Sequence, residues 1–402
     1  MTQRLYYGDS YAQRFAGRIL ELTPVAGGHC AVLDQSLFYP TSGGQPHDTG
    51  RLGESRVVEV TVREADGAVL HLLEGPLLPG AVEGVIDWPR RFDHMQQHSG
   101  QHILSQAFER IAEAPTVGFH LGTDRVSIDL GVASLSEAQV AAAESCANEI
   151  VSSNMRVRTW FPDPDELGAL TLRKQPEVRG PIRVVAIGDF DLSACGGTHV
   201  AATGEIGLIA VLKNERLKRG MRIEFLCGQR ARGDYARTHA ILRELSVALT
   251  CAPGELPDSV ARLRESLQQT RRELAREQER ALDAEATRRL EEATARTGYR
   301  VVRAAWAARP IEQVKGLALR LTAQSGVVAL LGVAGARSQL LFGRSEDVSL
   351  DLKPGFETAL AALGGGRGGG TRLLQGAAGA AELPALEHAL RAAEAALPGG
   401  SG

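Results

Sequence analysis

The sequence predicts an α+β protein of four consecutive parts: an antiparallel β-barrel, an α/β domain, a helical arm and a small C-terminal α/β domain. Three observations predict this order. Short apolar stretches broken by Gly, Pro and Asp fill the first 90 residues; a heptad repeat rich in Arg, Glu and Ala begins near residue 258; and strand and helix patterns alternate after residue 298. We place the parts at 1–90, 91–230, 231–297 and 298–402.

Length and composition set outer limits on the class of protein. A chain of 402 residues is long enough for roughly two to four domains, each with its own core. Its hydrophobic content of 44% is ordinary for a globular protein. The formal net charge of −3 argues against a protein coated with basic residues, although it allows local basic faces.

Cysteine usage and the N-terminus indicate a cellular compartment. The five cysteines have no framework spacing and their number is odd, so disulfide stapling is not expected. The start, MTQRLYYGDS, lacks an apolar signal-peptide region, and no run of about 18 apolar residues occurs. The sequence therefore predicts a cytoplasmic protein with no membrane span.

The barrel prediction rests on apolar stretches at 17–22, 30–33, 57–62 and 68–73. Between the second and third lies FYPTSGGQPHDTG, residues 38–50. Its Gly-Gly turn would let the backbone approach a ligand closely, and Gln45 can both donate and accept hydrogen bonds. An ordinary hairpin turn explains the local chemistry equally well.

Two short motifs dominate the second part: HSGQH at 98–102 and CGGTH at 195–199. If 96–110 is helical, His98 and His102 lie one turn apart on the same face. His94 extends this stripe by a turn, so one of the three histidines is surplus to a single ion. The paired glycines of CGGTH would let Cys195 and His199 turn toward a common point. Cysteine and histidine donors together suit one tetrahedral zinc ion, whereas either pair alone would more often consist of ordinary surface or core residues that bind no metal.

The rest of this part reads as strands and a helix around the motifs. We expect paired strands at 116–122 and 126–130, a long helix over 138–152 opened by Ser134 or Ser136, and strands at 157–160 and 182–187. Residues 203–228 then read as a hairpin with cations at and beyond its turn. These cations either lie on a solvated loop or contact phosphate groups of a polyanion: Lys213, Arg216, Lys218, Arg219 and Arg222.

The third part is predicted to be a coiled coil or helical hairpin. Val260, Leu267, Leu274 and Ala281 recur every seven residues, and Leu263 occupies an accompanying core position. A linker or a dimerisation arm is the natural interpretation.

The last part combines predicted strands at 301–304, 326–335 and 338–345 with a glycine-rich segment at 364–376. Glycine runs are commonly linkers, but the embedded arginines favour an anion-binding loop that leads into a helix and contacts a nucleic-acid backbone. The candidate contact residues are Gly364, Gly365, Gly366, Arg367, Gly368, Gly369, Gly370 and Arg372.

Four motifs resemble, in the same order, the editing region of alanyl-tRNA synthetases and the free-standing alanyl-tRNA editing proteins called AlaX: FYPTSGGQPHDTG, HMQQHSGQHILSQAF, CGGTHV and TGEIG. The glycine-rich segment resembles the C-terminal domain of alanyl-tRNA synthetase, so the long AlaX type is indicated. The resemblance implies a zinc-bearing editing domain and a C-terminal domain for tRNA binding and dimerisation.

The resemblance also implies an activity: hydrolysis of the ester between a wrong amino acid, chiefly serine and also glycine, and alanine-specific tRNA. His98, His102, Cys195 and His199 fall on the family's zinc positions, which leaves His94 in a second shell or on the surface. Because the chain starts directly at the barrel, we expect no aminoacylation domain and action in trans, on tRNA already released.

Four protein ligands would close the zinc site, so we expect zinc to orient substrate while side chains position water. A group that hydrogen-bonds the serine hydroxyl would be left unpaired with alanine. The candidates for contact with substrate or water are Thr116, His120, Gln45 and Gln101. Two other functions stay open: a zinc-containing tRNA-binding protein without hydrolysis, and an editing hydrolase for another tRNA such as that for threonine.

Overall fold

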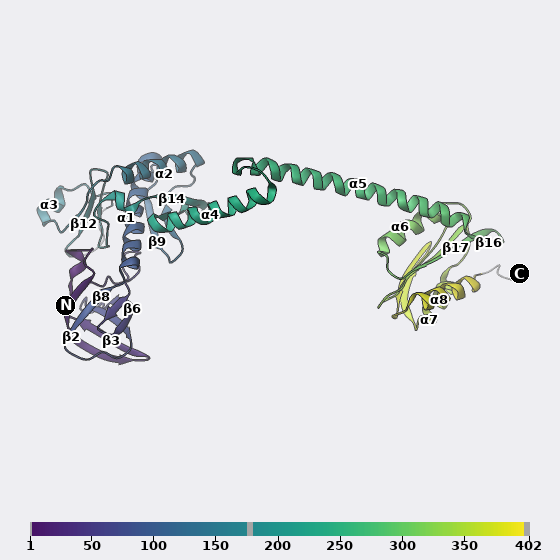
Figure 1. The fold of residues 1–402 in the computed structure, drawn as a ribbon, viewed down its shortest axis with the longest axis horizontal. Helices are drawn as coiled ribbons and strands as arrows, with labels where there is room; N and C mark the ends of the chain where they lie inside the picture. Colours follow the sequence, from purple (N-terminus) through teal and green to yellow (C-terminus); the bar gives the residue numbers. More distant parts are fainter. Residues whose placement is uncertain (1, 175–179, 398–402) are drawn as a thin grey trace. The chain divides into compact units, whose positions relative to one another are not determined.

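The computed structural model describes residues 2–174 and 180–397 (Figure 1). The chain divides into two compact units between Ala248 and Leu249, inside the predicted arm of 231–297, and each unit is described by itself. Among the described residues, no helix combines the length and apolar character needed to cross a bilayer.

The first unit begins with a closed antiparallel barrel, as predicted. Its strand order is β2-β3-β7-β6-β5-β8, and Leu33, Val57 and Leu73 are buried in its core. A short pair, β1 (Gln3–Arg4) and β4 (Gln35–Ser36), lies beside it, with the 3-10 helix η1 (Leu5–Tyr7) between them in the chain. The barrel strands are β2 (Arg14–Val25), β3 (Gly28–Leu33), β5 (Gly50–Leu52), β6 (Ser55–Val62), β7 (Val69–Glu74) and β8 (Ala81–Ile86).

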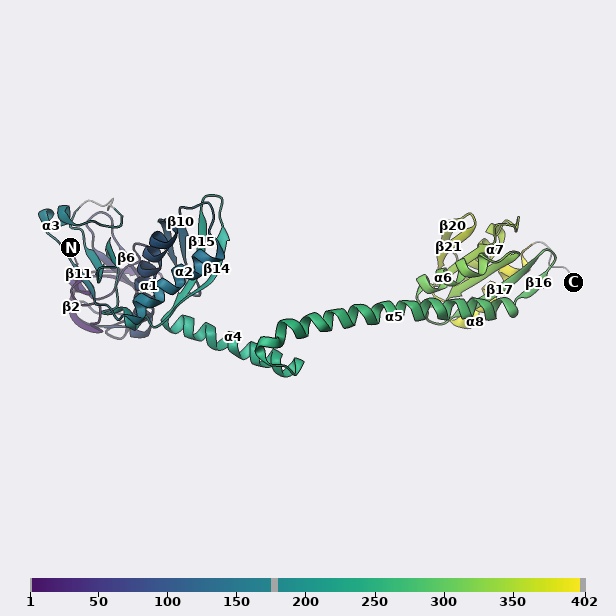
Figure 2. The same ribbon diagram turned by 90° about the horizontal axis from the view of Figure 1, so that it is seen from above.

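A long helix, α1 (Trp88–Ala112), follows the barrel and confirms the predicted helix. Pro89 stands in its first turn, where a missing N–H has no cost, and Ile103, Leu104 and Phe108 bury its apolar side. It packs against α2 (Glu137–Ser152) and a four-stranded sheet (Figure 2). Ser136, one of the two predicted N-caps, accepts a hydrogen bond from the backbone of Gln139. The sheet order is β14 (Ile209–Arg216), β15 (Met221–Cys227), β10 (Val126–Leu130) and β9 (Thr116–Leu121).

A second, three-stranded sheet delivers the CGGTH loop. It consists of β11 (Val157–Trp160), β12 (Val184–Ile187) and β13 (Asp191–Ala194). Ala194 pairs with Val184 at the end of β13, so Cys195 leaves the sheet at a fixed point. The short helices α3 (Pro164–Ala169) and η2 (Thr203–Ile206) flank this region, and α4 (Gly228–Leu249) ends the unit.

The second unit starts with η3 (Pro253–Glu255) and α5 (Leu256–Glu291), which confirms a long helix over the predicted arm. Near the C-terminal end of α5, Leu282 and Ala286 pack into a core with α6 (Ile311–Thr322), and Leu256 is buried at its start. The heptad residues Val260, Leu263, Leu267 and Leu274 are exposed by 45%, 58%, 51% and 57%. Pairing of this stripe with a second copy stays a prediction.

The C-terminal domain has helices against a sheet, as predicted. Alternate residues of β18 (Val327–Val333) face two separate cores. Val328 and Leu330 pack with α7 (Lys353–Ala362) and α8 (Leu383–Ala395), whereas Val327 and Ala329 pack with α6, and Figure 1 shows helices on both faces of this sheet. The sheet order is β16 (Thr294–Arg296), β17 (Tyr299–Trp306), β18 (Val327–Val333), β19 (Gln339–Arg344), β21 (Leu373–Ala378) and β20 (Gly366–Gly370), and the helices are α6, α7 (Lys353–Ala362) and α8 (Leu383–Ala395).

The glycine-rich segment corrects one expectation. It does not lead into a helix: residues 366–370 form the edge strand β20, paired with β21. A Cβ atom at Gly366 would lie 2.4 Å from the carbonyl oxygen of Ala377, so only glycine permits this close approach. Arg367 stands exposed on the edge strand, and Arg372 lies 3.6 Å from Glu346. The segment is therefore neither a free linker nor a helix-capping loop.

Candidate metal centre

The structure brings the four predicted ligands together. The ligand atoms of His98 and His102 on α1, and of Cys195 and His199 in the following loop, all lie within 4.8 Å of one another. The Sγ atom of Cys195 lies 3.4 Å from Nε2 of both His98 and His199. Tetrahedral zinc with bonds of roughly 2.3 Å to sulfur and 2.0 Å to nitrogen separates such ligands by about 3.5 Å. The group therefore fits zinc in both donor type and spacing.

Each imidazole is held through its other nitrogen. The Nδ1 atoms of His98, His102 and His199 meet, in that order, Gln45 Oε1 at 2.8 Å, Asp191 Oδ2 at 3.1 Å and Ser99 Oγ at 3.1 Å. An amide oxygen and a carboxylate only accept, so Nδ1 carries the hydrogen in the first two rings. The Ser99 hydroxyl can accept from the third ring in the same way. This tautomer leaves each Nε2 lone pair free for a cation, the usual arrangement around a bound metal.

Electrostatics at Cys195 favour the thiolate that a metal requires. Burial opposes ionisation, but the charges of the facing imidazoles lower the pKa of the Cys195 thiol well below its usual value. Burial lowers the pKa of His199 to about 3, which keeps that ring neutral. His102 differs, because burial is outweighed by Cys195 and Asp191, which raise its pKa to about 9. A metal cation would take the place of that proton.

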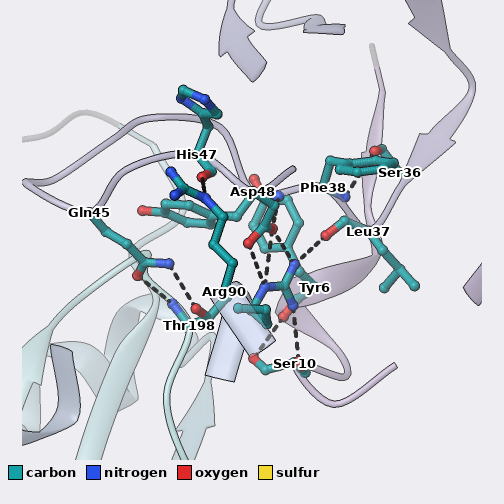
Figure 3. A network of polar contacts seen from close by, with 12 residues as sticks. Tyr6, Ser10, Ser36, Leu37, Phe38, Gln45, His47, Asp48, Arg90 and Thr198 are labelled. Atoms are coloured by element: carbon teal, nitrogen blue, oxygen red, sulfur yellow. Dashed lines mark hydrogen bonds and ion pairs between the residues drawn. The ribbon is translucent and has the colours of Figure 1, made fainter. Parts of the chain in front are cut away.

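Gln45 has a different position from the one expected. It is fully buried, so contact with water or substrate does not fit. Its Nε2 donates to Thr198 Oγ1 at 2.8 Å, and its Oε1 accepts from the Thr198 backbone N–H at 3.1 Å (Figure 3). The same oxygen also accepts from His98. Gln45 therefore ties the barrel loop to the helix and to the CGGTH loop.

The glycines of CGGTH also act differently from expectation. Neither Gly196 nor Gly197 has a positive φ. A Cβ atom at Gly197 would lie 2.2 Å from Cε1 of His98 and 2.9 Å from Oε1 of Gln45, whereas one at Gly196 would meet only the Tyr7 hydroxyl at 3.6 Å. Gly197 is thus required for close approach rather than for a bend.

A buried ion pair anchors the loop that carries Gln45. Arg91 and Asp48 are both fully buried, with Nη2 to Oδ2 at 2.5 Å. Arg91 also donates to the carbonyls of Ser10 and Leu37, and Asp48 accepts from the backbone N–H of Tyr39. Since nearly every polar atom here has a partner, the loop is fixed against the start of α1.

A cavity of about 560 Å³ opens beside the metal ligands. His98, His102 and Cys195 form part of its wall, and Thr116 and Gln101 line it as well. The hydroxyl of Thr116 and the side-chain amide of Gln101 each donate to Ser105 Oγ at 2.8 Å, so both side chains are held in place.

Two further histidines lie apart from this wall. His120 is exposed, 3.4 Å from Asp129, and does not line the cavity, so its predicted contact with substrate does not fit. His94, the surplus histidine, is buried rather than on the surface and lies outside the ligand group.

Comparison with known proteins identifies the family. Residues 182–224 match the domain described as the threonyl and alanyl tRNA synthetase second additional domain. The chain is 36% identical over 295 residues to an alanine–tRNA ligase of Pyrococcus furiosus, covering 68% of this chain and 32% of the relative. It is 34% identical over 278 residues to the alanyl-tRNA editing protein AlaX-L of Pyrococcus horikoshii, covering 66% and 67%. The chain belongs to the AlaX family of alanyl-tRNA editing proteins.

Coverage of the other relatives is partial. This AlaX family member spans about a third of the length of the ligases that it matches, and 62% of the alanyl-tRNA editing protein Aarsd1 of Bos taurus, to which it is 34% identical. The solved C-Ala domain of Aquifex aeolicus alanyl-tRNA synthetase covers 24% of this chain and 96% of its own length at 19% identity, with a TM-score of 0.22 that carries no weight here.

The AlaX chain carries its predicted cationic hairpin on β14 and β15, but two of the five cations are neutralised. Lys213 lies 2.5 Å from Glu215, and Arg222 holds Asp129 with two bonds of 2.7 and 2.8 Å. Arg216, Lys218 and Arg219 are exposed at the turn and next to it. These three are the hairpin cations best placed to reach a phosphate.

Proposed function

We propose that this AlaX family member hydrolyses the ester of mischarged alanine-specific tRNA, with seryl-tRNA as the chief substrate and glycyl-tRNA as a second. It acts in trans, on tRNA that the synthetase has released. The observation that carries the proposal is the cavity whose wall contains both the metal ligands and two fixed polar side chains, Thr116 and Gln101. Family membership supports the choice of tRNA.

His98, His102, Cys195 and His199 would hold one zinc ion, which when bound supplies a fixed positive charge that orients the amino acid or the terminal ribose. Four protein ligands resemble a closed site. The protein's own side chains therefore position the attacking water. An aminoacyl ester is labile enough to need no covalent nucleophile, and we assign the placement of water to Gln101.

Selectivity for serine over alanine requires a group that senses one hydroxyl. Thr116 is suited because its own hydrogen is engaged with Ser105, so its oxygen is left as an acceptor at the cavity wall. A serine hydroxyl would donate to it. Alanine is smaller and enters equally well, but leaves this oxygen without its partner.

The test follows ester loss from seryl-, glycyl- and alanyl-tRNA of the alanine type with the parent and with Thr116→Val. Loss of one hydrogen bond predicts a fall of about tenfold in kcat/KM for seryl-tRNA and no change for alanyl-tRNA. Thr23→Val, on an exposed barrel strand, is the matched control. Seryl-tRNA loss no faster than in buffer, with zinc bound, would instead identify a tRNA-binding protein without hydrolase activity.

The choice of tRNA needs its own comparison, because the matching domain is described for both threonyl and alanyl synthetases. Seryl esters of alanine- and threonine-specific tRNA should be offered in parallel. We expect preference for the alanine type, and the opposite preference would reassign the substrate. Arg216, Lys218, Arg219 and Arg367 are the proposed phosphate contacts, and they predict binding that weakens with salt.

A further inference from the structure

A second hollow, of about 330 Å³, lies in the first unit and shares no lining residue with the ester cavity. The two nevertheless flank the same segments. Pro46 lines the hollow and Gly43 the cavity, both from the loop that carries Gln45. Leu121 lines the hollow and Phe119 the cavity, both from β9. A ligand in the hollow would therefore contact the elements that frame the ester site.

His94 is the first sign that this hollow binds something. It lines the hollow with only 2% of its surface exposed. Its Nδ1 atom is buried and has no hydrogen-bond partner within residues 2–174 and 180–397. Buried polar atoms are nearly always paired, so an unpaired one in a cavity wall points to a bound group.

The charges around His94 indicate the sign of that group. Arg90 uses only Nε, which donates to the His47 carbonyl at 3.0 Å (Figure 3), and its two Nη groups have no partner in the part of the chain described. Asp93 is the carboxylate in the wall of the hollow, and it forms an ion pair with Arg230 through hydrogen bonds of 2.6 to 3.0 Å. The hollow is left with the unpaired charge of Arg90.

The charged groups that face His94 from neighbouring elements affect its protonation. Burial, followed by the charges of Arg90, Arg230, Arg91 and His47, lowers the pKa of His94 to about 3. The ring is thus neutral, and in the tautomer with hydrogen on Nδ1 it can donate a hydrogen bond but is not a counter-ion. An arginine fork beside a neutral donor suits a phosphate, whose oxygens accept several bonds at once.

We propose that this hollow binds a phosphate of the RNA strand whose aminoacylated end occupies the ester cavity, with Arg90 and His94 as donors. The inference rests on the proposed function for the identity of the strand. Thr123, in the β9–β10 turn at the edge of the hollow, is placed to add a hydroxyl contact. The contact would fix the end of the strand relative to the barrel loop, independently of which amino acid it carries.

Binding of an uncharged minihelix that ends in CCA tests the site without any hydrolysis. Its affinity for the full zinc-loaded chain is measured against salt concentration for the parent, Arg90→Gln and Arg90→Lys. Arg56→Gln, which removes an exposed barrel arginine, is the charge-matched control. We expect Arg90→Gln to weaken binding about tenfold and to lower the slope of log K against log salt by about 0.7, with partial rescue by lysine.

A second arm uses a seryl ester of adenosine, which carries no phosphate. Its hydrolysis by Arg90→Gln should match the parent within about twofold, because only the strand contact is lost. An unchanged salt slope for Arg90→Gln, or a tenfold fall in its hydrolysis of the phosphate-free ester, would overturn the site. A parent that binds the minihelix with the expected slope but hydrolyses neither this ester nor seryl-tRNA would instead overturn the proposed function alone. Thermal melting of each variant checks that it is folded.

Discussion

Gly197 gives the sharpest test of how the metal ligands are held. Replacement by alanine adds one methyl group at a position whose backbone conformation alanine tolerates, since Gly197 has no positive φ. That methyl carbon would lie 2.2 Å from Cε1 and 2.4 Å from Nδ1 of His98, and 2.9 Å from Gln45 Oε1. The perturbation therefore acts directly on the ring and on the amide that orients it.

The size of the effect follows from these distances. Carbon atoms pack at about 3.5 Å or more, so the His98 ring has to retreat by at least about 1 Å. Such a shift breaks the 2.8 Å bond to Gln45 and moves Nε2 out of reach of a shared ion. Overpacking of this kind costs about 1–3 kcal/mol, and loss of a group that orients a ligand weakens metal binding about 10- to 100-fold.

The assay is a zinc competition with a chromophoric chelator, made on the parent, Gly197→Ala and Gly196→Ala. Gly196 is the matched control, because its new methyl group meets only the Tyr7 hydroxyl at 3.6 Å. We expect Gly196→Ala to bind zinc with the affinity of the parent and Gly197→Ala to bind it about 10- to 100-fold more weakly. Equal affinities for the two variants would refute the close-approach explanation.

Two further predictions concern stability. Arg91→Met leaves the buried Asp48 carboxylate uncompensated and should lower the free energy of unfolding, measured by urea titration, by about 3–5 kcal/mol. The double variant Arg91→Met/Asp48→Asn should be less destabilised than Arg91→Met alone. The reverse order of stability would contradict the pairing. Burial lowers the pKa of His71 to about 4 in the folded chain. The contribution of His71 to the free energy of unfolding is therefore complete above about pH 6.5 and is lost as the pH falls toward 4, because the unfolded chain takes up the proton first. His71→Gln should reduce the pH slope of stability in this window by about 1.4 kcal/mol per unit, and an unchanged slope would show that His71 is not responsible.

The ligands could be predicted from the sequence because their spacing is local. One helical turn brings His98 toward His102, and a short loop does the same for Cys195 and His199. The barrel and the C-terminal sheet were likewise predictable, since alternation and turn residues are read within each segment.

The partners that hold the rings could not be found in this way. Gln45 is 53 residues from His98 and 153 from Thr198, and no local pattern links them. The Gly-Gly-Gln loop was a signal of close backbone approach, but it did not reveal that the amide would be buried. Asp191, which holds His102, carried no signal at all because a single acidic residue in a strand is unremarkable in sequence.

The glycine run failed for a different reason. Glycine has low strand propensity, so residues 366–370 read as loop, yet they pair with β21. A Cβ atom at Gly366, Gly368 or Gly370 would meet a carbonyl oxygen of that strand within 2.5 Å. The charged hairpin was predicted, and the neutralisation of Lys213 is local, since Glu215 lies two residues away on the same strand. The neutralisation of Arg222 could not be predicted, because only the sheet register brings Asp129 opposite.

The clamp made by Gln45 has a consequence for how the protein matures. His98 comes from a helix, Thr198 from a loop a hundred residues later, and the amide that joins them from the barrel loop. Zinc affinity should therefore rise only after all three segments have met. In a chain whose barrel is misfolded, the His98 ring lacks the amide oxygen that orients it, and we expect weaker zinc binding.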